Sequence, residues 1–236
     1  MWTCTSTYKY NPYFSVNSLG NDNLEEQAQC IYEELFANED ISQLIELGDV
    51  IETTSGGTPS RSNNSFYEAG NVNWVKSKEL NGTFLINTEE LITDVAVKKS
   101  SAKLLPQNSV LIAMYGATVG QYAIISKQMT CNQAICALQP NENYPYTFLF
   151  ILAKNKKEEL MNKAVGSAQQ NISQILIKQL LISQNIKMIK KYDNLARPLF
   201  EKMKKNIIEN ENLSALRDSL LPKLMSGELK ISDLNS

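Results

Sequence analysis

The chain has 236 residues, of which 43% are apolar and 20% charged, and it carries 23 basic and 25 acidic side chains but no histidine. This length and composition suit one globular domain or two small ones, and they exclude wholesale disorder and a collagen-like fibre. The absence of histidine excludes a Ser-His-Asp triad, a Cys-His nucleophile pair and a His-ligated zinc site.

The cysteines and the first residues of the chain bear on its compartment. No Cys-x-x-Cys pair occurs among the four cysteines, which are Cys4, Cys30, Cys131 and Cys136. We therefore expect reduced thiols rather than a disulfide framework or a zinc site. Residues 1–20 contain one lysine and no apolar run of seven or more, so we expect no signal peptide and a soluble, cytoplasmic protein.

The overall charge limits the kind of DNA contact that the chain can make. The formal net charge is −2 and the pI is near 5.4, whereas a domain with a broad DNA-binding face has a pI above about 9. Any DNA contact is therefore expected to be local, or shared with a partner.

A first helix is predicted within residues 22–40, whereas residues 1–21 follow no period that identifies an element. Apolar side chains recur at spacings of four, three and four residues, at Leu24, Ala28, Ile31 and Leu35. Asp22 or Asn23 can act as the N-cap. This helix is either an ordinary surface helix on its own core or the remnant of a coiled coil.

Residues 41–185 contain short apolar runs separated by turn residues, a pattern typical of a mixed α/β domain. Two helices are expected, the first stopping before Pro106, at Thr93–Lys103 and Tyr146–Ala164. The irregular order of these elements favours a compact α+β domain over a doubly wound sheet. Strands are expected at Leu47–Thr54, Val72–Ser77, Ser109–Met114, Gly120–Ile125 and Cys131–Leu138.

Residues 186–236 are predicted to form a long helix of the coiled-coil type. Pro198 would cost about 3 kcal/mol in a helix interior, so we expect a kink or a fresh start there. Pro222 and Gly227 are expected to end the helix. The apolar seam needs a partner, because a lone helix would expose it to water; it comprises Met188, Tyr192, Leu195, Leu199, Met203, Ile207, Leu213, Leu216 and Leu220.

Two loops carry side chains suited to DNA. The loop 56–61 is rich in glycine but lacks the lysine and the spacing of a phosphate-binding loop. It is either a flexible hairpin connection or a contact to DNA phosphates or base edges. The loop 166–171 carries amide side chains that suit an adenine edge, although amide-rich loops are more often plain turns. A third segment, 115–120, is expected to be a tight structural turn.

Residues 11–14, Asn-Pro-Tyr-Phe, resemble the motif with which amino-methyltransferases hold their target amine. No glycine-rich turn for a methyl donor follows this motif in the chain. A stand-alone methyltransferase is therefore not expected.

In their order along the chain, several segments between Leu24 and Ile231 resemble the DNA-specificity subunit of type I restriction-modification systems. These segments are Leu24–Gln29 running to Phe36, Gly56–Arg61 with Trp74 downstream, Gly116–Gly120, Asn132–Ala134, Gly166–Ile172, Leu216–Asp218 and Leu220–Glu228. The resemblance implies that 41–185 is a target recognition domain and 186–236 a conserved spacer helix. Residues 22–40 would then be the remnant of a preceding spacer.

The resemblance also implies partners. Family members hold two such units, each reading half of a split site, with antiparallel spacer helices fixing the distance between them. A single unit implies a half-subunit that pairs with a second copy or with another half. Modification (methyltransferase) subunits and a restriction/translocase subunit are the implied protein partners, and no membrane is involved.

The implied role is non-catalytic recognition of double-stranded DNA. No cofactor or metal is expected in this chain, because S-adenosylmethionine, ATP and Mg would act on the partner subunits. The alternative is a truncated interaction protein that binds the modification subunit through its helices without reading DNA. The DNA-binding candidates are Gly57, Thr58, Ser60, Arg61, Lys76, Lys78, Lys127, Gln169, Gln170 and Asn171.

Overall fold

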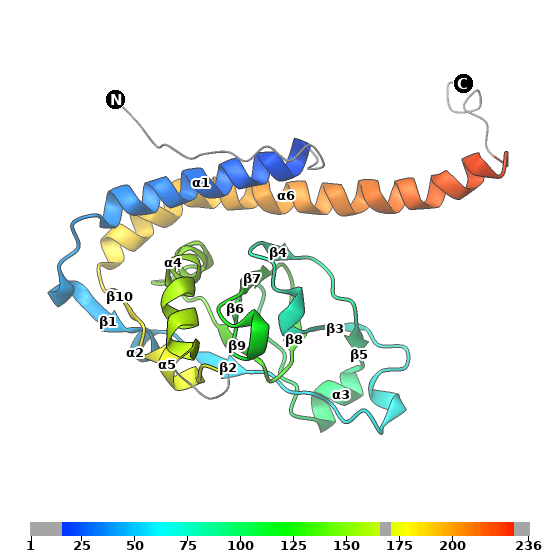
Figure 1. Cartoon of the computed structure of the whole chain (residues 1–236), viewed down its shortest axis with the longest axis horizontal. Helices are drawn as coiled ribbons and strands as arrows, with labels where there is room; N and C mark the ends of the chain where they lie inside the picture. Colours follow the sequence, from blue (N-terminus) through cyan, green and yellow to red (C-terminus); the bar gives the residue numbers. More distant parts are fainter. Residues whose placement is uncertain (1–15, 166–170, 229–236) are drawn as a thin grey trace.

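The computed structural model describes residues 16–165 and 171–228. A mixed α/β body carries two long antiparallel helices along one side, α1 (Val16–Phe36) and α6 (Ile186–Met225) (Figure 1). The sequence prediction of a compact α/β unit with a long C-terminal helix is thus confirmed. None of the described helices is both long and apolar enough to cross a lipid bilayer.

The body contains three small sheets joined by short helices. A five-stranded sheet has the order β2-β9-β6-β7-β4, a three-stranded sheet the order β5-β3-β8, and β1 pairs with β10. The strands are β1 (Leu44–Glu46), β2 (Thr53–Ser55), β3 (Val72–Val75), β4 (Phe84–Leu85), β5 (Leu91–Ile92), β6 (Val110–Ala113), β7 (Tyr122–Ile125), β8 (Thr130–Cys131), β9 (Ile135–Leu138) and β10 (Leu181–Ser183).

Four α-helices and four 3-10 helices connect these strands in the described part of the chain. The α-helices are α2 (Leu47–Val50), α3 (Asp94–Lys99), α4 (Tyr146–Val165) and α5 (Gln174–Lys178). The 3-10 helices are η1 (Ile41–Gln43), η2 (Asn64–Phe66), η3 (Ser77–Glu79) and η4 (Gly116–Thr118).

The central strand β6 is buried on both faces, which explains why it is an uninterrupted apolar run. Val110 and Ile112 point into the core cluster that includes α4 and α6. Leu111 and Ala113 point the other way, into a second cluster beneath the three-stranded sheet. Side chains therefore alternate between two cores with the period of two residues that a strand imposes.

The pairing of β1 with β10 explains why the two long helices lie side by side. The register is antiparallel and places Leu44 opposite Ser183. Since β1 follows α1 and β10 precedes α6, this pairing brings the end of α1 to the start of α6. The helices therefore run back along the body as an antiparallel pair (Figure 1).

The expected strand at 47–54 is wrong in its first half. Residues Leu47–Val50 form a helical turn, closed by the Ile51 amide donating to the Leu47 carbonyl at 2.9 Å. Leu47 and Ile51 are both buried, and their spacing of four residues fits a helix better than a strand. Only Thr53–Ser55 forms a strand.

The expected strand at 131–138 is in fact two strands in different sheets. Thr130–Cys131 pairs with β3, and Ile135–Leu138 pairs with β2 and β6. The side chain of Asn132 accepts a hydrogen bond from the Ala134 amide at 3.2 Å. This local turn changes the chain direction between the two strands.

The predicted start of the first helix at Asp22 or Asn23 is wrong, because α1 already begins at Val16. The other expected elements are present with slightly different ends. Thr93 caps α3 by accepting from the Ala96 amide at 3.2 Å, as predicted, but the helix ends at Lys99 rather than Lys103. The helix α4 starts at Tyr146 as expected. The strands β3, β6 and β7 fall inside their predicted ranges.

The fresh start expected at Pro198 does not occur, since Pro198 lies inside α6, a single helix of 40 residues. Ala196, Phe200 and Met203 flank the proline and are at most 1% exposed. Burying large apolar side chains of this kind stabilises by roughly 1.5–3 kcal/mol each, which offsets the cost of about 3 kcal/mol at the proline. Pro222 also lies inside the helix, and Gly227 follows the C-cap with a φ of 75°.

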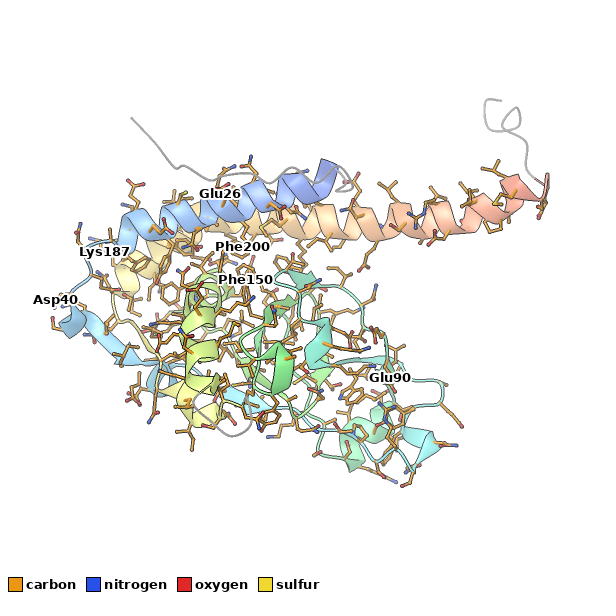
Figure 2. All side chains as sticks on the ribbon, in the orientation of Figure 1. Glu26, Asp40, Glu90, Phe150, Lys187 and Phe200 are labelled. Carbon is orange, nitrogen blue, oxygen red and sulfur yellow. The ribbon has the colours of Figure 1, made fainter. Side chains whose placement is uncertain are left out.

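The antiparallel helix α1 covers most of the first half of the predicted seam, with Leu195 left exposed. Tyr192 meets Tyr32 edge-on at a ring distance of 5.8 Å, and Asn206 donates to Asn21 at 2.8 Å. On the other side, Phe200 meets Phe150 of α4 edge-on at 5.2 Å (Figure 2). Much of the partner that the seam needs is therefore supplied within the chain.

Candidate nucleic-acid interface

The loop 56–61 lies pressed against the body and is not the flexible hairpin connection that the sequence suggested. The Gly57 amide donates to the Cys131 carbonyl at 2.9 Å, and the indole of Trp74 donates to the Gly57 carbonyl at 3.0 Å. A Cβ at Gly57 would lie 2.5 Å from the Ser101 carbonyl carbon, and one at Gly56 would lie 2.0 Å from the Cys131 oxygen. Glycine is needed here for close backbone approach.

Other segments from distant parts of the chain join this loop. Thr58 donates a hydrogen bond to Gln133 in the turn before β9. Behind that turn, the Met114 amide donates to the Ala134 carbonyl at 2.8 Å. The Met114 carbonyl in turn accepts from the Ile172 amide at 2.8 Å.

We call these segments the loop strip, defined as residues 56–61, 115–118, 132–134 and 171–173. Tyr115 and Asn171 form an isolated antiparallel bridge inside it. The strip adjoins β2 and α5, which lie at the end of the body opposite the helix pair (Figure 1). Its exposed side chains offer donors and acceptors at Thr58, Ser60, Arg61, Tyr115, Gln133, Asn171 and Ser173.

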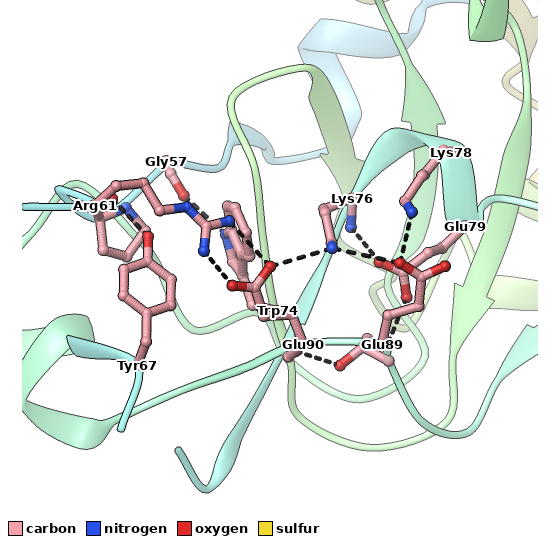
Figure 3. Close-up of polar contacts among 11 residues, drawn as sticks. Gly57, Arg61, Tyr67, Trp74, Lys76, Lys78, Glu79, Glu89 and Glu90 are labelled. Carbon is pink, nitrogen blue, oxygen red and sulfur yellow. Dashed lines mark hydrogen bonds and ion pairs between the residues drawn. The ribbon is translucent and has the colours of Figure 1, made fainter. Parts of the chain in front are cut away.

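The strip shares Arg61 with an ion-pair cluster of three cations and three carboxylates. The cluster comprises Arg61, Lys76, Lys78, Glu79, Glu89 and Glu90 (Figure 3). Arg61 is paired with Glu90 through both terminal nitrogens. Lys76 Nζ lies 3.1 Å from Glu90 and 3.4 Å from Glu89. Lys78 Nζ lies 2.6 Å from Glu89.

Glu79 holds the backbone of this cluster. Its carboxylate accepts from the amide of Lys76 at 3.0 Å and from the amide of Glu89 at 3.1 Å. It therefore ties the start of η3 to the loop between β4 and β5. Glu79 thereby helps to fix the backbone of Lys76 relative to that of Glu89.

Two aromatic rings hold the guanidinium of Arg61. Its central carbon lies 4.3 Å from the ring centre of Tyr67 and 5.2 Å from that of Trp74. The hydrogen bond from Arg61 lowers the pKa of Glu90 to about 2, and the same bond raises the pKa of Arg61. Both groups are therefore charged at neutral pH.

The remaining DNA-binding candidates are placed differently. Lys127 donates to Asn87 at 3.0 Å, and Asn87 donates to Glu211 of α6 at 2.8 Å. Lys127 therefore lies on the helix side of the β4–β5 loop and is not part of the loop strip. Gln169, Gln170 and the motif at 11–14 lie outside the described residues.

The acidic half of the ion-pair cluster was not predicted from the sequence. Glu89 and Glu90 follow Lys76 by 13 and 14 residues, and no local period links the two segments. The pairing depends on β3 and β5 being antiparallel neighbours. The sign in the sequence that could have indicated this contact is that Glu89 and Glu90 are adjacent carboxylates shortly after the basic residues Lys76 and Lys78.

The helix residues predicted to meet a partner fall into two groups. Toward the body, Tyr192 and Met203 are buried, and Leu24, Ile31, Leu199 and Ile207 pack on the same core cluster, with Met188 half-buried beside them. Away from the body, Leu195, Leu213 and Leu216 are 50%, 53% and 53% exposed, and Leu220 is half-buried.

We call residues 208–225 the distal helix segment. Since Asn21 lies beside Asn206 and α1 begins at Val16, the antiparallel pair ends near residue 211, and α6 continues past it (Figure 1). Large apolar side chains on this segment are exposed at Ile208, Leu213, Leu216, Leu221 and Met225.

The described residues hold no group of three or more Cys, Asp or Glu side chains that could bind a metal ion. The buried thiols are also chemically quiet. Burial raises the pKa of Cys131 and of Cys136 to about 12.

Comparison with known proteins places the chain among restriction systems. The family model of the type I restriction modification DNA specificity domain matches residues 38–188. The specificity subunit of the type I restriction enzyme HindI from Haemophilus influenzae is 29% identical over 195 residues, which are 80% of this chain and 41% of that protein. The EcoR124I/EcoR124II specificity subunit from Escherichia coli is 30% identical over 121 residues, covering 50% of this chain and 30% of that protein.

Solved structures support the fold. The S subunit of a type I restriction-modification system from M. genitalium has a TM-score of 0.58 and 16% identity, covering 89% of this chain and 57% of that one. The HsdS subunit from Thermoanaerobacter tengcongensis has a TM-score of 0.54 and 15% identity, covering 91% and 53%. The chain spans less than half the length of the curated relatives named above.

Proposed function

Because the chain belongs to the family of type I restriction modification DNA specificity domains, we propose that it is a non-catalytic subunit that reads DNA sequence and directs a type I restriction-modification complex to its target. The observation that carries this proposal is the loop strip. Segments separated by more than 50 residues meet there and present hydrogen-bonding side chains on one rigid surface.

The loop strip suits recognition of base edges in the major groove. Amide and hydroxyl side chains, such as Asn171, Gln133 and Thr58, can pair with the donors and acceptors that distinguish the bases there. Their backbones are fixed by close packing, so little conformational freedom is lost on binding. A rigid platform of this kind favours sequence discrimination over general affinity.

Charge supports a division of labour with partner subunits. A chain of net charge −2 neutralises few phosphates, and phosphate contacts supply much of the affinity for DNA. We expect weak, salt-sensitive DNA binding by the chain alone and tight binding in complex with modification subunits. S-adenosylmethionine, ATP and Mg would act on those partners and on the restriction subunit.

The distal helix segment is the proposed assembly surface. Its apolar stripe continues the seam that α1 covers, so a further antiparallel helix can cover it in the same way. A second copy of the chain, or another half-subunit, would supply that helix and place two recognition domains about a two-fold axis. The target would then be a palindrome with a fixed spacer.

A second function remains as an alternative: a truncated interaction protein that binds the modification subunit through α1 and α6 without reading DNA. The fixed geometry of the loop strip favours the DNA-reading function over this one. If the chain is only an interaction protein, the loop strip binds no ligand, and substitutions of its exposed side chains leave function unchanged.

A band-shift titration of duplex DNA with the chain and its modification subunits tests the proposal. The complex is expected to bind tightly, and Arg61→Ala is expected to weaken that binding. If the modification subunits bind DNA equally well with and without the chain, the interaction protein is the correct reading. Sedimentation of the isolated chain at micromolar concentration tests self-pairing, which a monomer would contradict.

A further inference from the structure

The ion-pair cluster contains as many carboxylates as cations, whereas a surface that binds phosphates has an excess of cations. Three side chains of the cluster are formally cationic, Arg61, Lys76 and Lys78, and three are formally anionic, Glu79, Glu89 and Glu90 (Figure 3). The cluster is therefore neutral overall. A neutral cluster offers little net attraction to a phosphate, and counterion release from DNA needs an unpaired cation.

Arg61 is held far more firmly than a surface cation usually is. Its side chain is 55% exposed, yet both terminal nitrogens bond Glu90 and the guanidinium lies over the ring of Tyr67. Trp74, which is 2% exposed, forms the second ring contact and is itself fixed to the loop carbonyl of Gly57. The direction of the guanidinium is thus set before any ligand arrives.

The held guanidinium still has donors to offer. It carries five N–H groups, and the two bonds to Glu90 use two of them. Within the described part of the chain, no side chain or carbonyl accepts from its Nε. The Nε–H and a neighbouring terminal N–H lie side by side in the plane of the guanidinium. This pair of donors, held in a fixed direction, matches the O6 and N7 acceptors on the major-groove edge of guanine.

We propose that Arg61 reads a guanine in the DNA target and that Glu90 is the positioning residue that aims it. This assignment rests on the proposed function and deepens it, since it names a base and the side chain that reads it. Glu90 acts through Arg61 and does not itself touch the base. Glu89 holds only lysines, so it sets the charge of the surface without setting the direction of Arg61.

Comparing Glu90→Gln with Glu89→Gln separates an effect on the direction of Arg61 from an effect on the charge of the surface. Both substitutions remove one carboxylate charge from the same loop and keep the size of the side chain. Only the Glu90 substitution weakens the hold on Arg61. Arg61→Lys is the third variant, because it keeps the charge but loses the planar pair of donors.

The experiment selects from a randomised duplex DNA library with the chain in complex with its modification subunits. The wild-type complex is expected to require guanine at one or more positions. Arg61→Lys is expected to lower that preference at one base pair by about 5- to 150-fold, and Glu90→Gln is expected to lower it at the same base pair. Glu89→Gln is expected to leave the selected sequence unchanged.

Several outcomes overturn the assignment. If Glu90→Gln and Glu89→Gln change overall affinity and salt dependence alike while every variant selects the wild-type sequence, Arg61 is a phosphate contact. If the lost preference is for a base other than guanine, the named base is wrong. If the wild-type complex selects no sequence at all, the proposed function itself fails. Thermal unfolding of each variant checks that the fold is kept.

Discussion

Substitutions at Met203 and Leu216 separate the two halves of the α6 seam. The sequence places both residues on one apolar stripe, but Met203 is 1% exposed and Leu216 is 53% exposed. Met203→Ala removes a buried side chain and leaves a cavity between α6 and its neighbours, which costs about 2–5 kcal/mol. Leu216→Ala removes an exposed side chain from a helix, and its effect is expected to stay within about 0.5 kcal/mol.

Urea unfolding measures this difference. With a slope of about 2 kcal/mol per molar urea, Met203→Ala is expected to lower the midpoint by about 1–2.5 M. Circular dichroism follows the helices, and the fluorescence of buried Trp74, measured in a Trp2→Phe background, follows the body. The protein should be as dilute as detection permits, so that association does not contribute.

The comparison can refute the intramolecular pairing of the helices. If Met203→Ala leaves the midpoint unchanged, α6 does not pack on the body and α1 as described. If Leu216→Ala lowers the midpoint as much in dilute solution, the distal helix segment is covered within the chain. Either result would remove the distinction between the two halves of the seam.

Three further outcomes follow from the structure. Gly57→Ala places a Cβ against backbone atoms, so it is expected to destabilise the fold by about 1–3 kcal/mol and to weaken DNA binding. The matched control is Gly20→Ala, whose Cβ meets nothing within 4 Å and which should stabilise α1 by about 0.5–1 kcal/mol. Equal changes in the free energy of unfolding, measured in urea, would contradict this. The pKa of Glu90 is lowered from 4.5 to about 2, so its pairing stabilises the fold above pH 4.5 and this contribution is lost as the pH falls towards 2. The stability difference between wild type and Glu90→Gln should shrink over that range, and a constant difference would show that the carboxylate charge is not involved. Burial raises the pKa of Cys131 and Cys136 to about 12, so a maleimide at pH 8 should label them only after unfolding, as peptide mass mapping can check.

Local patterns in the sequence were sufficient for the elements that are regular in themselves. The helix α4 and the cap at Thr93 could be predicted, because a helical period and a capping residue act over a few neighbouring positions. The short helix at Leu47–Val50 was mistaken for a strand, since one turn gives too few residues to distinguish the two periods.

Long-range pairing could not be predicted from spacing. The seam of α6 indicated that a partner helix was needed, but the partner α1 is fixed by the pairing of β1 with β10, two strands of three residues each. The carboxylates of the ion-pair cluster were missed for the same reason. Their contact depends on which strands become neighbours, and no local pattern reports that.

Individual residues of the candidate site could be predicted from the sequence, but the way they come together in space could not. Loop 56–61 and Asn171 were singled out by glycine content and amide chemistry. The turn at Gln133 joins them only because β8 and β9 separate around it. The sequence therefore indicated which chemistry was available, and the fold determines where it is concentrated.

Hydrogen exchange of the chain in complex with its modification subunits, with and without bound duplex DNA, tests the central claim most directly. If the loop strip reads DNA, exchange of the backbone amides at 58, 60–61, 115–118 and 171–173 slows when DNA is added, while the distal helix segment is unchanged. If these amides exchange at the same rate with and without DNA, while protection is confined to the helices, the loop strip does not contact DNA.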